Sequence, residues 1–71
     1  MEKSSNWHKI SGQWKQVMGN AKKKWGKLTD DELMQASGNR EILAGKIQEK
    51  YGVTKDEANK QIDEWAEEMK L

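Results

Sequence analysis

A single apolar stripe constrains the fold of this chain more than any other feature. At 100° per residue, one arc of about 100° collects most of the large apolar side chains of the first 25 residues: Trp7, Ile10, Trp14, Val17, Met18, Ala21 and Trp25. Such a stripe is typical of a helix that packs one face against a core. The chain has 71 residues and neither Pro nor Cys, so its stability must come from packing rather than disulfides. The four Trp are the main candidates.

The glycines and the stripe together suggest where the first helix lies. Gly12 lies on the opposite side of the helix from the stripe, and glycine in a helix interior favours a break there. We therefore predict a firm helix over 13–25 and treat 1–12 as a weakly determined N-terminal segment. The domain proper is then 13–71. Gly26 follows the last residue of the stripe, and we expect it to end the helix in the left-handed conformation.

Capping patterns predict the later helices. Thr29 precedes Glu32 by three residues, and Thr54 precedes Glu57 by the same spacing, which is the capping-box pattern. Asn39 is a suitable cap for a helix between them. We therefore expect four helices, with ends near Gly38 and Gly52 for the second and third. The predicted core is Trp14, Val17, Ala21, Trp25, Leu28, Leu33, Leu43, Ile47, Tyr51, Ile62 and Trp65.

The six glycines indicate an internal duplication. Gly12, Gly19 and Gly26 are seven residues apart, and the spacing repeats 26 residues later at 38, 45 and 52. Flanking residues also agree, since Lys24-Trp25-Gly26 corresponds to Lys50-Tyr51-Gly52. Chance spacing is the alternative, but the flanking agreement favours duplication.

The fold class that follows is all-α. No segment alternates apolar and polar residues for long enough to predict a strand. The expected connections, 26–28, 37–39 and 52–53, are short, so neighbouring helices must turn back on each other as α-hairpins. Two hairpins crossed around the Trp side chains are the most economical architecture.

Two stretches of this sequence resemble a known family. These are WGKLTDDE at 25–32 and GKIQEKYG at 45–52, with further likeness from about Trp14 to Trp65. The pattern closely resembles the CsbD-like family of small bacterial stress-associated proteins. The resemblance implies a SAM-like bundle of two crossed α-hairpins and expression under general stress. It implies no catalytic residue, cofactor or partner.

The residues suited to catalysis do not form a recognisable pattern. His8 is the only His, and neither a nucleophile nor an acidic orienting residue stands at a useful spacing from it. The carboxylates of Asp30, Asp31 and Asp56 fall in the first turns of expected helices, where they complement the helix dipole. We predict no catalytic residue and no enzyme.

Metal and phosphate sites are also not predicted. A structural zinc site needs about four ligands, usually Cys and His, and this chain offers one His. The consecutive acids Asp30, Asp31 and Glu32 point to different sides of a helix and do not match a calcium loop. GNAKKKWG lacks the spacing and the final residues of a Walker loop. We predict no cofactor-binding or metal-binding residue.

The distribution of charge supports an alternative function. Residues 1–28 carry seven Lys and one Glu, whereas 56–71 carry six acids and two Lys, although the net charge is only +1. Lys22, Lys23 and Lys24 could make weak nucleic-acid contacts through phosphates. The opposing interpretation is a solvated face, neutralised or shielded by Asp63, Glu64, Glu67 and Glu68 of the last helix. We favour the second interpretation.

The leading functional hypothesis is a non-enzymatic, cytoplasmic protein of the bacterial general stress response. The N-terminus has no apolar run of signal-peptide length and no segment reaches the length of a membrane span. We expect a monomer that does not associate with membranes, and the molecular target is unknown. Nucleic-acid binding by the basic first helix is the alternative.

Overall fold

The computed structural model describes the backbone of residues 4–69 and the side chains of residues 7–69. Five helices make up this part of the chain: α1 (Ser4–Gly12), α2 (Trp14–Lys24), α3 (Asp30–Ala36), α4 (Arg40–Tyr51) and α5 (Lys55–Met69). The all-α prediction is confirmed. The prediction of four helices is wrong, because the segment before Gln13 forms a helix of its own.

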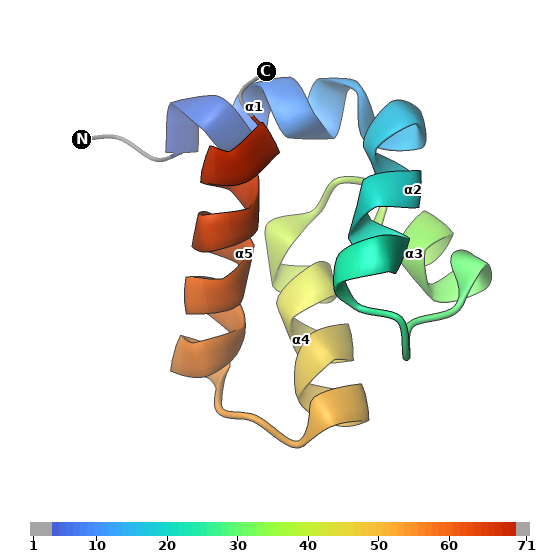
Figure 1. Ribbon diagram of the computed structural model, residues 1–71, viewed down its shortest axis with the longest axis vertical. Coiled ribbons are helices and arrows are strands. Elements are labelled where there is room, and N and C mark those ends of the chain that lie inside the picture. The colour runs from blue at the N-terminus through green and yellow to red at the C-terminus, as the bar shows by residue number, and fades with distance from the viewer. Residues whose placement is uncertain (1–3, 70–71) are drawn as a thin grey trace.

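The apolar stripe spans α1 and α2, which meet at Gln13. The N–H of Gln13 lies 3.2 Å from the carbonyl oxygen of Lys9 and 3.1 Å from that of Ile10, so the chain turns here with few lost backbone hydrogen bonds. Figure 1 shows α1 lying across one end of α5, which it contacts. Ile10 is fully buried, so α1 contributes to the same core as the other helices.

The end of α2 differs from the prediction. Among the described residues, only Gly38, Gly52 and Ser37 have positive φ, so the expectation of a left-handed Gly26 is wrong. Trp25 itself is the C-terminal cap residue, with φ −118° and ψ 76°. The N–H of Leu28 then bonds to the carbonyl of Trp25 at 3.0 Å, and this tight turn makes a left-handed glycine unnecessary.

The capping predictions for α3 and α4 are confirmed. Thr29 and Glu32 form both hydrogen bonds of a capping box at the start of α3. The Asn39 side chain accepts hydrogen bonds from the N–H groups of Glu41 and Ile42 at the start of α4. Gly52 ends α4 with φ 66°, a backbone conformation that favours glycine.

Gly38 sits where α3 turns into α4 and has a second constraint besides its φ of 78°. A Cβ placed there would lie 2.9 Å from the Cβ of Ser11, closer than side chains tolerate. Glycine therefore lets the α3–α4 turn approach α1. Gly12, the duplication partner of Gly38, has open space around it, so paired glycines differ in their roles and the duplication stays a sequence-based hypothesis.

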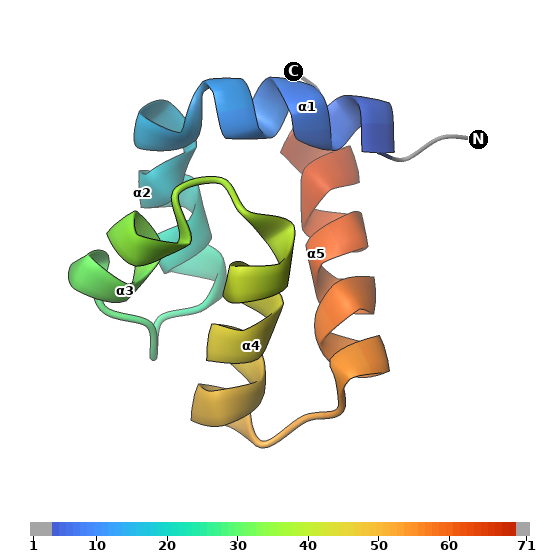
Figure 2. The same cartoon turned by 180° about the vertical axis from the view of Figure 1, so that it is seen from behind.

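Helices α4 and α5 run side by side as an α-hairpin, and α4 lies between α5 and α3 (Figure 2). Thr54 caps the start of α5, since its side-chain oxygen accepts the N–H of Glu57 at 3.1 Å. The carboxylate of Glu57 accepts a hydrogen bond from the Gln61 amide at 3.1 Å. The connection spans 52–54, one residue more than the predicted 52–53, and it turns the chain back as its short length predicts.

The core agrees closely with the predicted set. All of the predicted core residues are buried except Tyr51, which is half-buried. Its hydroxyl accepts the backbone N–H of Lys27 at 3.0 Å, and this polar end keeps the ring at the surface. Ile10, which the apolar stripe also includes, is fully buried, and four alanines outside the predicted set are buried too: Ala36, Ala44, Ala58 and Ala66.

Candidate functional site

The Trp side chains form the centre of the molecule. The ring centroid of Trp65 lies 5.2 Å from that of Trp25, 6.3 Å from that of Trp7 and 6.4 Å from that of Trp14. The rings meet mostly edge to face, an arrangement that adds stability beyond the buried area. The prediction that these rings pack in the core, rather than stack on bases, is confirmed for Trp14, Trp25 and Trp65, and Trp7 is half-buried.

Three indole N–H groups connect different elements. Trp7 donates to the carbonyl of Gly38 at 3.0 Å, and Trp14 donates to the carbonyl of Leu33 at 2.8 Å. Trp25 donates to the Gln61 side chain at 2.9 Å. The N–H of Trp65 is buried and has no hydrogen-bond partner within the described part of the chain. The Trp cluster therefore fixes α1, α2 and α5 relative to one another, which is a structural role.

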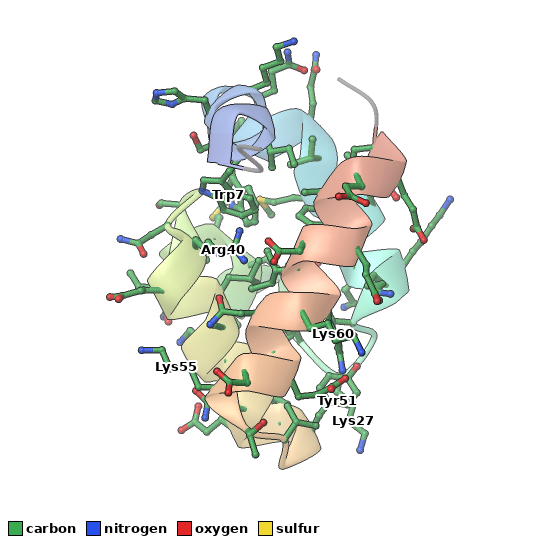
Figure 3. All side chains as sticks on the ribbon, turned by 90° about the vertical axis from the view of Figure 1, so that its left-hand side faces the viewer. Trp7, Lys27, Arg40, Tyr51, Lys55 and Lys60 are labelled. Carbon is green, nitrogen blue, oxygen red and sulfur yellow. The ribbon has the colours of Figure 1, made fainter. Side chains whose placement is uncertain are left out.

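Arg40 ties α4 to α5 and α1, a role that the sequence analysis missed. Its guanidinium donates to the side chain and the carbonyl of Asn59, both at 3.2 Å, and pairs with the carboxylate of Asp63. It also lies 6.0 Å from the ring centroid of Trp7, and Figure 3 shows the two side chains near each other. Arg40 is the only Arg of the chain, and this planar, multiply bonded position suits it better than Lys.

The three lysines singled out by the sequence occupy the last turn of α2. Lys23 and Lys24 are exposed, while Lys22 is half-buried. Positive charge at a helix C-terminus complements the helix dipole, so these lysines also stabilise α2. Because consecutive helical residues point about 100° apart, the three lysines form a basic surface spread around this end of α2, where Lys23 and Lys24 are exposed.

The acid that approaches this surface comes from α3. The Nζ of Lys22 lies 3.8 Å from the carboxylate of Asp30, whereas Asp63 of the last helix pairs with Arg40. The expectation that Asp63 occupies these lysines is wrong, since Asp63 pairs with Arg40. The loop after α2 instead brings Asp30, in the first turn of α3, close to Lys22. At this separation and exposure the Lys22–Asp30 pair contributes little.

A second charged cluster joins the start of α3 to the end of α4. The Nζ of Lys50 lies 3.1 Å from the carboxylate of Glu32. The backbone N–H of Thr29 and then Lys50 lower the pKa of Glu32 below its usual 4.5, partly opposed by burial. Nearby, Lys27 places its ammonium 5.2 Å from the ring centroid of Tyr51 (Figure 3). These contacts hold the α2–α3 loop against α4.

The remaining predicted side chains do not converge. His8 is exposed on α1, and Asp31 and Asp56 are exposed in the first turns of α3 and α5. Within residues 4–69, no group of three or more His, Asp or Glu could hold a metal ion. No helix in this range is long and apolar enough to cross a membrane.

Comparison with known proteins gives one consistent result. The family model described as CsbD-like matches residues 8–60. The chain is 50% identical over 60 residues to the UPF0337 protein YjbJ of Escherichia coli O6:H1, covering 84% of this chain and 87% of that protein. It is 49% identical over 65 residues to the UPF0337 protein RPA4217 of Rhodopseudomonas palustris, covering 92% and 98%. No solved structure matches the chain significantly.

Proposed function

Because the chain belongs to the CsbD-like family, we propose that it is a non-enzymatic, cytoplasmic protein of the bacterial general stress response. The stress role comes from the resemblance carried by residues 25–32 and 45–52. The relatives reported above are bacterial, which is consistent with the proposal.

The contacts that the described polar side chains make support the proposal that the protein is not an enzyme. Glu32 completes a cap and binds Lys50, and Asp63 binds Arg40. His8 lies exposed on α1, and it belongs to no group of potential metal ligands among the described residues. A catalytic site needs a nucleophile, base or metal converging on one point, and these groups are instead used to hold helices together.

We propose a role that depends on the folded surface rather than on any reacting group. The matched test is complementation in a bacterium that lacks the gene, using wild type, His8→Ala and Trp25→Ala. Under osmotic or stationary-phase stress, wild type and His8→Ala restore survival, whereas Trp25→Ala fails because it removes a core side chain. Loss of function in His8→Ala with the fold intact by circular dichroism would contradict the proposal.

Expression and location need a separate measurement. Immunoblots of cytoplasmic and membrane fractions should show the protein in the cytoplasm, with its amount rising under stress. Cross-linking in stressed cells, followed by identification of bound protein and nucleic acid, tests for the target. Turnover of a recovered small molecule by the purified protein would make it an enzyme, and an unchanged level across stresses would end the stress assignment.

The SAM-like arrangement also belongs to this proposal. We assign α2 with α3, and α4 with α5, as its two crossed hairpins, since the helices of each pair contact each other and are joined by short loops. Interhelical distances measured by nuclear magnetic resonance test the assignment directly.

A further inference from the structure

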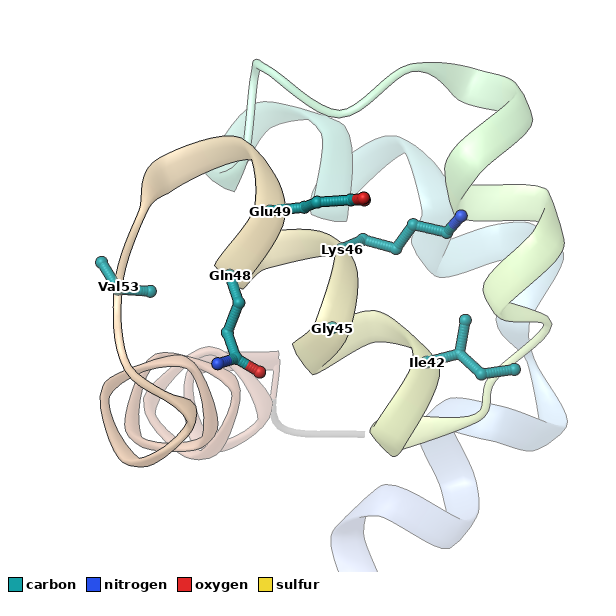
Figure 4. A pocket seen from close by; sticks show the side chains of 6 residues that line it. All are labelled: Ile42, Gly45, Lys46, Gln48, Glu49 and Val53. Atoms are coloured by element: carbon teal, nitrogen blue, oxygen red, sulfur yellow. The ribbon is translucent and has the colours of Figure 1, made fainter.

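An open groove runs along α4, outside every contact described so far. It encloses about 550 Å³ and is lined by Ile42, Gly45, Lys46, Gln48, Glu49 and Val53 (Figure 4). Ile42 is 42% exposed, and within the described residues only Met34 is a more exposed large apolar side chain. A Cβ at Gly45 would meet nothing within 4 Å. The groove therefore offers exposed apolar surface and a backbone that another helix can approach closely.

Four of the six residues that line the groove occupy symmetric positions in the sequence. Ile42 on α4 lies at one end, and Val53, half-buried in the connection that follows α4, lies at the other. Lys46 and Glu49 lie between them (Figure 4). Both pairs are centred on the same point of the sequence, between Ile47 and Gln48. Reading the order backwards exchanges the cation with the anion and leaves an apolar residue at each end. A surface with this property is complementary to itself under a two-fold rotation.

We propose that this groove is a homodimerisation surface, occupied by α4 of a second copy of the chain running antiparallel to the first. In this pairing each Lys46 faces Glu49 of the other copy, and each Ile42 faces Val53 of the other copy. This inference is independent of the stress role.

The groups involved are available in the single chain. Glu49 is exposed, and Lys46 donates one hydrogen bond to the exposed Gln35 side chain at 2.8 Å. An ammonium has three donors, so this bond leaves two for a carboxylate across the interface. Lys50 is held by Glu32 at 3.1 Å, which keeps its charge directed toward α3 rather than toward the groove.

The surface is small, so the dimer should be weak. One face of a single 12-residue helix offers well under the roughly 800 Å² per partner of a standard stable interface. We expect a dissociation constant on the order of 0.1–1 mM, since association must offset the loss of translational and rotational freedom. The protein is then a monomer when dilute and a dimer at high concentration.

The decisive experiment exchanges the two charges, using sedimentation equilibrium of the full chain from about 10 μM to 2 mM, a range set to bracket the expected constant. Lys46→Glu alone brings two like-charge pairs together, and so does Glu49→Lys alone, so each should weaken dimerisation roughly tenfold. An equimolar mixture of the two variants restores opposite charges at both pairs. The double variant Lys46→Glu/Glu49→Lys restores them within one chain, so both should dimerise within about twofold of wild type.

A control separates this contact from net charge. Lys60 and Glu64 are exposed on α5, and Lys60→Glu changes the net charge as Lys46→Glu does. Lys60→Glu and Glu64→Lys should leave the constant within about twofold of wild type. Ile42→Ser should weaken dimerisation without any change of charge. The proposal would be overturned if the wild type is a monomer at 2 mM. It would also be overturned if the mixture of Lys46→Glu and Glu49→Lys dimerises no more tightly than either variant alone.

Discussion

Trp25 packs edge-on against Trp65 with ring centroids 5.2 Å apart, and this contact joins the end of α2 to α5 at the centre of the core. Trp25 is 1% exposed and Trp65 is 2% exposed. The two rings come from residues 40 positions apart, so their contact depends on the complete fold rather than on one hairpin.

Removing the Trp25 ring should destabilise the protein severely. We expect Trp25→Ala to lower the free energy of unfolding by about 3–5 kcal/mol, because it leaves a cavity against Trp65. Trp25→Phe keeps an aromatic ring but loses the hydrogen bond to Gln61, so its loss should be smaller. Urea denaturation measures both. An unchanged cooperative transition in Trp25→Ala would show that this ring is not central.

The core could be predicted from the sequence because helical periodicity determines which side chains share a face. Trp14, Ala21 and Ile62 follow from that periodicity alone, and all are buried. The capping box of Thr29 with Glu32 was also predictable, since it depends on residues three positions apart.

Features that depend on long-range contacts were not predictable. Arg40 and Asp63 are 23 residues apart, and no local pattern connects them. Gly12 indicated a break close to Gln13, but the sequence did not establish that the segment before it forms a helix of its own, Ser4–Gly12. The position of Gly26 predicted a left-handed glycine at the end of α2, but α2 ends instead in a tight turn between Trp25 and Leu28. The groove on α4 requires knowing which face of that helix its neighbours leave uncovered.

The half-buried Arg40 should contribute strongly to stability. We expect Arg40→Lys to cost about 1–2 kcal/mol, because Lys cannot make the forked hydrogen bonds to Asn59 and Asp63. Thermal or urea denaturation measures the loss. Lys55→Gln on α5 is the control, since Lys55 is exposed and its loss should leave stability nearly unchanged. Equal stabilities for Arg40→Lys and wild type would show that the contacts of Arg40 with Asn59 and Asp63 do not stabilise the fold.

Two glycine substitutions should have opposite effects. Gly52→Ala forces alanine into a left-handed backbone with φ 66° and should destabilise the fold by about 1 kcal/mol. Gly19→Ala lies within α2 with nothing within 4 Å of the added Cβ and should stabilise it by roughly 0.5–1 kcal/mol. Denaturation midpoints compare the two directly, and shifts of the same sign would show that the backbone assignment at one glycine is wrong.

The lowered pKa of Glu32 predicts that acid weakens the contact between the start of α3 and the end of α4, and with it the stability of the fold. Because the folded state holds the carboxylate ionised through the Thr29 N–H and Lys50, it binds the proton less tightly than the unfolded state does. The resulting stability is fully present above the usual pKa of 4.5 and is lost as pH falls through the lower folded value.

The corresponding measurement compares wild type with Glu32→Gln in denaturant from pH 7 to pH 3. Wild type should be the more stable at neutral pH, and the difference should shrink at acidic pH. Glu64→Gln removes one negative charge from an exposed position on α5 and serves as the control. A stability difference that stays constant down to pH 3 would mean that Glu32 is not held by these contacts.

The basic surface of α2 provides the last prediction. Lys23 and Lys24 are exposed, and the ammonium of Lys22 lies 3.8 Å from the carboxylate of Asp30, yet the chain carries a net charge of only +1. We expect no binding of duplex DNA or RNA above background at physiological salt, because the long-range field of the molecule is weak.

If phosphates do bind here, Lys22→Gln/Lys23→Gln/Lys24→Gln should reduce the salt dependence by up to ~3 units of log-log slope. Fluorescence anisotropy with labelled duplexes at increasing salt measures this. Micromolar, salt-dependent binding that disappears in the triple variant, with its fold intact by circular dichroism, would show that α2 is a nucleic-acid interface.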